Sequence, residues 1–289
     1  MGIKHFHPSG ICLYFICSLG ITVFSFDPYI AALSLIGAFL NLLSLGALRG
    51  GRVLTLPIFM IIISAIVNPL FSHRGETELL FVNGAPITLE AIVYGAVSGA
   101  VLGAATLICF ALTEVIDSKK TMQLLGGIAP KTAIVLSGAI RFFPELMRLH
   151  SRVRDAQRGV GRLPDDRPID RLRSTLRVWL ALIGLAFSNA AEQARLMEAS
   201  GFEPDKPRRA IKDFRFSRRD LILICATIVL FTAALVPVAL GYTETAFYPV
   251  LSVPRGTFSL LAYASALILF CLPAIINGAT KWHYLRSKI

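Results

Sequence analysis

Arginine is the residue type with the clearest binding chemistry in this sequence, and it recurs in two short stretches. The first, RVRDAQRGVGR, covers residues 152–162, and the second, RLMEASGFEP, covers residues 195–204. A guanidinium group pairs bidentately with carboxylates, so it suits recognition of an acidic surface on another protein. Each stretch also contains a small residue and a glycine, which let a helix end fit closely into a groove. The simpler alternative is that the arginines only hold a helix to anionic lipid headgroups.

Catalytic motifs are missing from the sequence. The five histidines are dispersed, and there is no H-E-x-x-H, P-loop lysine motif, G-x-S-x-G elbow or cluster of aspartates. The five cysteines lie inside apolar runs, where they serve as small packing residues. We therefore expect a non-catalytic protein with no catalytic residue, metal site or cofactor.

The composition is that of a membrane protein. Hydrophobic residues make up 55% of the 289 residues and charged residues only 16%, whereas soluble domains have about 25% charged residues. Six apolar runs are long enough to be predicted as membrane-spanning helices. They cover residues 11–26, 29–48, 53–71, 87–112, 221–240 and 258–280.

Positive charge predicts the orientation in the membrane. The segment 118–219 holds 21 of the 29 lysine and arginine residues, so the positive-inside rule places it in the cytoplasm. Lys4, Arg49 and Arg52 then also fall inside, as does the C-terminal tail. The expected topology is six spans with both termini cytoplasmic, in the cell (plasma) membrane of a prokaryote, with contacts to the lipid bilayer and none to nucleic acid.

The basic segment is predicted to contain two long amphipathic helices separated by the turn GRLPDDRPID. The apolar stripe of the first is Phe142, Leu146, Leu149, Val153, Ala156 and Val160. That of the second is Leu172, Leu176, Trp179, Ile183, Ala186, Ala190, Ala194 and Met197. The centre of the second is apolar all round, but one span here alone would invert the orientation of everything downstream. We expect both helices to lie along the inner membrane face.

Within the fourth run, Gly95, Gly99 and Gly103 recur every four residues on one helix face. Glycine allows close approach of helix backbones in a membrane, so these residues are predicted to serve helix packing. Thr88 and Glu90 at the start of this run are predicted to cap the helix. The fold class is thus an all-α polytopic membrane protein of about six transmembrane helices, with a cytoplasmic coupling domain of two long amphipathic helices.

In combination, these motifs resemble the transmembrane (T) component of energy-coupling factor (ECF) transporters, which are ABC-type importers. That family carries an Ala-Arg-Gly motif at the end of each of two coupling helices. DAQRGVG matches the first through Ala156, Gln157, Arg158 and Gly159. MEASGF matches the second through Glu198, Ala199 and Gly201, with Ser200 where arginine is expected and Arg195 one turn earlier. LSGAIRFFPEL (136–146) and the stretch 68–95 are also similar to the family, and the C-terminal pair of helices is less diagnostic.

The resemblance implies a mechanism and partners. Two ABC ATPase subunits would each receive one coupling-helix end, and a substrate-binding S component in the membrane would bind the vitamin or trace metal. The implied domains are residues 1–117 (helices 1–4), 118–219 (coupling domain) and 220–289 (C-terminal helices). Two alternatives stay open: a secondary transporter or channel with a basic regulatory domain, and a membrane-embedded enzyme. A secondary transporter should show intramembrane acids or an internal repeat, and neither is evident.

Overall fold

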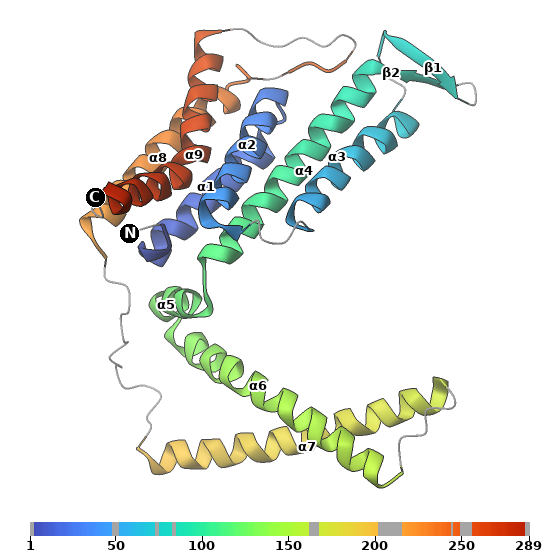
Figure 1. Ribbon diagram of the computed structural model, residues 1–289, viewed down its shortest axis with the longest axis vertical. Coiled ribbons are helices and arrows are strands. Elements are labelled where there is room, and N and C mark those ends of the chain that lie inside the picture. The colour runs from blue at the N-terminus through green and yellow to red at the C-terminus, as the bar shows by residue number, and fades with distance from the viewer. Residues whose placement is uncertain are drawn as a thin grey trace. The chain divides into compact units, whose positions relative to one another are not determined.

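A computed structural model describes residues 3–47, 52–72, 75–82, 85–161, 168–201, 216–243, 245–248 and 256–286. These residues form nine α-helices, a 3-10 helix and one β-hairpin (Figure 1). The helices are α1 (Pro8–Phe24), α2 (Pro28–Leu45), α3 (Arg52–Phe71), α4 (Leu89–Val115), α5 (Ser118–Ile128), α6 (Pro130–Gly159), α7 (Pro168–Ala199), α8 (Arg218–Ala239) and α9 (Thr257–Arg286). The prediction of an all-α polytopic membrane protein is confirmed. The antiparallel hairpin of β1 (Glu78–Val82) and β2 (Ala85–Thr88) was not predicted; it takes in residues 87 and 88, so α4 begins later than expected.

The chain divides into two compact units. Unit 1 consists of Met1–Thr121 and Asp213–Ile289, and unit 2 consists of Met122–Lys212. Unit 1 therefore holds α1 to α4, α8, α9 and the hairpin, whereas unit 2 holds α6, α7 and most of α5.

Helix boundaries follow local capping rules. Proline occupies the first turn of α1, α2 and α6, where its missing N–H costs no hydrogen bond. Asp27 caps α2 by accepting hydrogen bonds from the backbone N–H groups of Tyr29 (2.7 Å) and Ile30 (3.3 Å). α8 begins with a capping box between Ser217 and Asp220. These caps explain why the apolar runs became helices close to their predicted positions.

The three glycines of α4 lie against α3. A Cβ added at Gly95 would come within 2.5 Å of the Ser64 carbonyl oxygen, and one at Gly99 within 2.7 Å of Ile61 Cα. A Cβ at Gly103 would meet Pro57 at 3.2 Å. Close backbone approach is the property that makes small residues useful between membrane helices. Polar bonds join the same helices, because the Asn68 amide donates to the Ala91 carbonyl at 2.7 Å.

An asparagine side chain joins α2 to α9 at the point where Pro273 interrupts α9. Proline has no N–H and disturbs the preceding turn, which frees backbone groups. The Asn41 amide nitrogen donates to the Phe270 carbonyl (2.9 Å), and its oxygen accepts from Ala274 N–H (3.1 Å). In a regular helix these two backbone groups would bond to each other. The Asn41 side chain therefore takes the place of one backbone hydrogen bond of α9. This contact makes α9 an integral part of unit 1.

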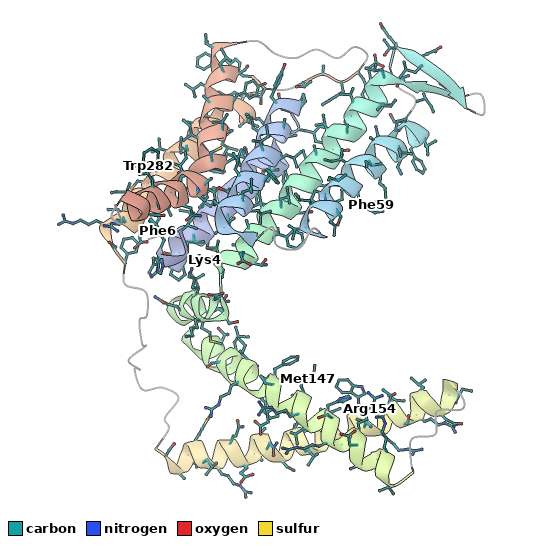
Figure 2. The ribbon with its side chains drawn as sticks, viewed as in Figure 1. Lys4, Phe6, Phe59, Met147, Arg154 and Trp282 are labelled. Carbon is teal, nitrogen blue, oxygen red and sulfur yellow. The ribbon has the colours of Figure 1, made fainter. Side chains whose placement is uncertain are left out.

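Contacts at one end of unit 1 collect four chain segments. Lys4 forms a 3.0 Å ion pair with Glu114 near the end of α4 (Figure 2). Ile3 N–H donates to Asn277 in the last part of α9 (2.8 Å), and His7 N–H donates to Asp220 at the start of α8 (2.7 Å). The end of α4 and the start of α8 thus lie at the same end of unit 1. The two chain connections to unit 2 therefore both start from that end.

The opposite end of unit 1 centres on Asp27. Its second carboxylate oxygen accepts hydrogen bonds from Tyr263 (2.9 Å) at the start of α9 and Thr245 (3.1 Å) in the loop before it. An aromatic cluster of Phe26, Tyr94 and Phe247 lies at this end, with ring centroids 5.0–5.7 Å apart. Aromatic side chains are enriched where membrane helices meet water.

Six of the described helices are long and apolar enough to span a bilayer. They are Pro28–Leu45, Val53–Phe71, Leu89–Val115, Leu172–Ala199, Arg218–Ala239 and Thr257–Thr280. Five match predicted spans. The other predicted span, α1, has 17 residues, at the short end of the range of about 17–25 that can cross. Leu172–Ala199 was predicted to be a coupling helix. If this helix crossed the membrane once, the end of α4 and the start of α8 would lie on opposite sides of it, whereas both lie at the same end of unit 1.

Unit 2 contains two long helices that pack across each other. α6 has 30 residues and α7 has 32, and Figure 1 shows the C-terminal half of α6 crossing α7. His150 of α6 meets Trp179 of α7 with ring centroids 5.9 Å apart. The predicted stripe of α6 is partly buried at Phe142, Leu146, Leu149 and Val153. The predicted stripe of α7 is mostly exposed, and its buried residues are instead Ser174, Val178 and Leu182.

Candidate coupling surface

The first arginine-rich stretch forms the C-terminal end of α6. Ala156 and Arg158 are exposed in its last turn, Gln157 is partly buried, and Gly159 is the last helical residue. The chain turns away at Gly161, which has a left-handed φ of 66°. Gly161 N–H donates to the Arg158 carbonyl (3.0 Å), which is one of the carbonyls that a helix end leaves without a partner. α6 therefore ends at Gly159, and Gly161 forms the left-handed turn that follows the helix.

The second stretch forms the C-terminal end of α7. Arg195, Glu198 and Ala199 are exposed in its last turns, and Gly201 follows with a left-handed φ of 74°. Gly201 N–H donates to the Glu198 carbonyl (3.0 Å). Ser200 is exposed, and its hydroxyl donates to the Met197 carbonyl (2.7 Å). Ser200 is therefore bonded to its own helix, where an arginine would extend away from it.

Both helices are followed by a glycine in a left-handed conformation, but the motif glycine has a different position relative to that turn in each helix. Gly159 lies inside its helix two residues before the terminating glycine, whereas Gly201 is itself the terminating glycine. The sequence motifs alone do not distinguish these positions, because both have a small residue, a polar residue and a glycine. The second glycine of GVG, Gly161, was the signal that identifies the turn.

The two ends point away from each other. In Figure 1, α6 ends on one side of the crossing point and α7 ends on the other. Among the described residues, neither Arg158 nor Arg195 forms an ion pair. Each guanidinium group is consequently available to a carboxylate on another molecule.

Apolar side chains are exposed along the rest of both helices. On α6, Val135 is 73% exposed and Met147, labelled in Figure 2, is 58% exposed. On α7, Leu180 and Phe187 are 69% and 74% exposed. Exposed apolar surface of this extent is typical of a surface that contacts a membrane or another protein.

Comparison with known proteins identifies relatives of this chain. It is 24% identical to the energy-coupling factor transporter transmembrane protein EcfT of Lacticaseibacillus paracasei over 200 residues, which are 63% of this chain and 72% of that protein. It is 26% identical to EcfT of Streptococcus thermophilus over 204 residues, 66% of this chain and 76% of that protein.

A shorter similarity involves an uncharacterised protein of Mycoplasma pneumoniae. The two are 31% identical over 100 residues, which cover 34% of this chain and 23% of that protein. A comparison with protein-family models found no match. The EcfT relatives agree with the helical membrane architecture described above, and over 63–66% of its length the chain is similar to the transmembrane (T) component of energy-coupling factor transporters.

Proposed function

We propose that this chain couples two ABC ATPases to a substrate-binding S component, so that ATP hydrolysis drives uptake of a vitamin or trace metal. The observation that carries the proposal is the pair of crossed helices in unit 2, whose C-terminal ends, with Arg158 in the last turn of α6 and Arg195 near the end of α7, point in opposite directions (Figure 1). Two separate, outward-facing helix ends suit two separate partners. The proposed role is non-catalytic, with ATP hydrolysis in the partner subunits.

At the first end, Arg158 is proposed to pair with a carboxylate in a groove of one ATPase, while Ala156 and Gly159 permit close approach and Gln157 lies beside them. All but Gln157 are exposed at the end of α6. A charge-assisted, bidentate pair has the strength and geometry that a coupling contact requires.

At the second end, close fit is proposed to replace the charge. Ala199, Ser200 and Gly201 are small and exposed, and Arg195 and Glu198 supply polar contacts one turn earlier. The hydroxyl of Ser200 already bonds to Met197, so Ser200 adds little to binding. The two ends are therefore proposed to bind their ATPases unequally.

We also propose that unit 2 and both termini face the cytoplasm of a prokaryotic cell. The arginine and lysine excess of this segment supports the orientation, and so does the attachment of both its connections at one end of unit 1. Single cysteines at Glu76 and Asp155, in a cysteine-free background, should react with an impermeant thiol reagent in intact cells only at Glu76. Labelling at Asp155 from outside would contradict this topology.

Affinity purification of the tagged chain from its native membranes tests the coupling role. Two ATPase subunits and one small membrane protein should co-purify, and ATP hydrolysis should disappear from the sample when the ATPases are stripped off. The identity of the small membrane protein would define the substrate. If the chain purifies alone and transports or catalyses by itself, the coupling role is wrong.

A further inference from the structure

The joint between α4 and α5 is where the chain passes from unit 1 toward unit 2. α4 ends at Val115, Ile116 has an extended backbone, and α5 begins at Ser118. Val115 is 1% exposed and belongs to the core of unit 1. The first four residues of α5 belong to unit 1, and the same helix continues into unit 2. A contact that fixes the first turn of α5 therefore also fixes the chain segment that connects the two units.

Lys120 in that first turn is buried. It is 2% exposed, and its ammonium group donates a 2.8 Å hydrogen bond to the Val115 carbonyl oxygen. The last carbonyls of a helix lack intrahelical partners and carry the negative end of its dipole, so they attract a cation. The Lys120 side chain thus ties the start of α5 back onto the end of α4.

The neighbouring charges show that this burial is specific. Lys119 is exposed, and Lys4 and Glu114 form an ion pair whose side chains are 47% and 45% exposed. Burial lowers the pKa of the Lys120 ammonium; Asp117 opposes this shift and Lys4 adds to it. Buried lysine is costly to desolvate, so a position that only needed solubility or a positive surface would not require it.

We propose that Lys120 is a positioning residue, whose bond to Val115 holds α5 in a fixed direction so that movement of the coupling helices is transmitted to the membrane helices. This inference rests on the proposed coupling function and adds the joint through which the coupling acts. Loss of the anchor should leave ATPase binding at the two helix ends intact, because those residues are distant in sequence and exposed. Hydrolysis would then continue with less uptake.

The test compares Lys120→Met with Lys119→Met, which removes the same charge one residue earlier from an exposed site. Each complex is purified with its ATPases and S component and reconstituted in vesicles. Lys120→Met should retain ATP hydrolysis but lower the number of substrate molecules taken up per ATP. In Lys120→Met the Thr121 amide, which donates to the Asp117 carbonyl (3.1 Å), should exchange hydrogen about ten-fold faster, the order of effect expected when a hydrogen bond to a charged group is lost. Lys119→Met should match the wild type in both measurements.

A measurement on the wild-type complex covers the case in which Lys120→Met does not accumulate. An amine-reactive reagent should modify Lys119 and leave Lys120 unmodified, both at rest and during ATP turnover. Equal modification of the two lysines, a normal uptake-to-ATP ratio in Lys120→Met, or the same defect in Lys119→Met would overturn the proposal. Failure of the ATPases to bind the wild-type chain would instead contradict the coupling function itself.

Discussion

Unit 1 and unit 2 use their polar and small residues in different ways. In unit 1, Asn41, Asn68 and Asp27 bond to residues on other helices or loops, and Gly95 allows two backbones to approach. Hydroxyl groups in both units bond to carbonyls three or four residues earlier, as Ser18 and Thr227 do in unit 1 and Thr132 and Ser151 do in unit 2. A Cβ added at Gly138, Gly159 or Gly184 would meet nothing within 4 Å.

Unit 1 thus uses polar and small residues to fix how its own helices pack, whereas unit 2 leaves such residues exposed on its surface. Internal polar bonds are valuable in lipid, where an unpaired backbone group has no water to bond to. Exposed helices with local bonds keep their shape and leave their side chains available. The exposed apolar residues of α3, such as Phe59 at 62% (Figure 2), suit contact with lipid, and those of α6 and α7 suit contact with a membrane or another protein. Four sets of substitutions test this contrast.

The largest effect is expected for Arg158→Glu at the end of α6. Reversing one partner of a partly desolvated charge pair typically costs about 3–5 kcal/mol, so one ATPase should be lost from the purified complex. Arg152→Glu makes the same charge change on another face of α6 and should retain both ATPases. Membrane expression should be equal in the two variants. Normal ATPase binding in Arg158→Glu would mean that unit 2 does not use this arginine as a contact.

Next in size is Asn41→Leu in unit 1. It leaves the Ala274 N–H without the Asn41 oxygen and leaves the Phe270 carbonyl with the longer 3.4 Å bond from the Tyr14 hydroxyl, at about 1–3 kcal/mol for a buried group left unpaired. The melting temperature of the purified chain should fall. Asn189→Leu, on the partly exposed surface of α7, is the control and should change it little. A similar loss in both variants would remove the contrast between the units.

Gly95→Ala should destabilise unit 1 by about 1–3 kcal/mol, as overpacking does in a tight core, because its Cβ would overlap the Ser64 carbonyl. Gly138→Ala in α6 meets no neighbour and should stabilise the helix by up to about 1 kcal/mol. Thermal unfolding of the two variants should shift in opposite directions. A neutral Gly95→Ala would show that α3 and α4 do not pack as closely as described.

The smallest effects are expected at the second helix end. Gly201→Leu puts a side chain at a left-handed φ of 74°, which costs roughly 1–2 kcal/mol, whereas asparagine tolerates this conformation better. Ser200→Ala loses only a local hydrogen bond and should cost less than about 1 kcal/mol. The loss of uptake should therefore be smallest in Ser200→Ala, larger in Gly201→Asn and largest in Gly201→Leu. A severe loss in Ser200→Ala would contradict the unequal binding of the two ends.

Helix positions were largely predictable because they depend on neighbours in the sequence. Apolar runs, the proline at the start of α2 and the Asp27 cap act over one or two turns. The hairpin was not predicted, because its two strands are short and lie directly before a helix start. The face of α7 that packs on α6 was also missed: Val178 and Leu182 are buried, but a helix that is apolar on most sides does not indicate which side faces its partner.

The class of protein, the position of most helices, the basic segment and the motifs that resemble a T component could all be read from the amino-acid sequence. Each of these depends on local composition, because lipid selects apolar runs and backbone hydrogen bonds within a helix join residues four apart. The packed structure was needed to show that Asn41 fills the break at Pro273, that Gly161 forms the turn after α6, and that Lys120 is buried on Val115. An asparagine or lysine side chain can face lipid, water or a backbone carbonyl, and the helices that pack around it determine which of these it meets.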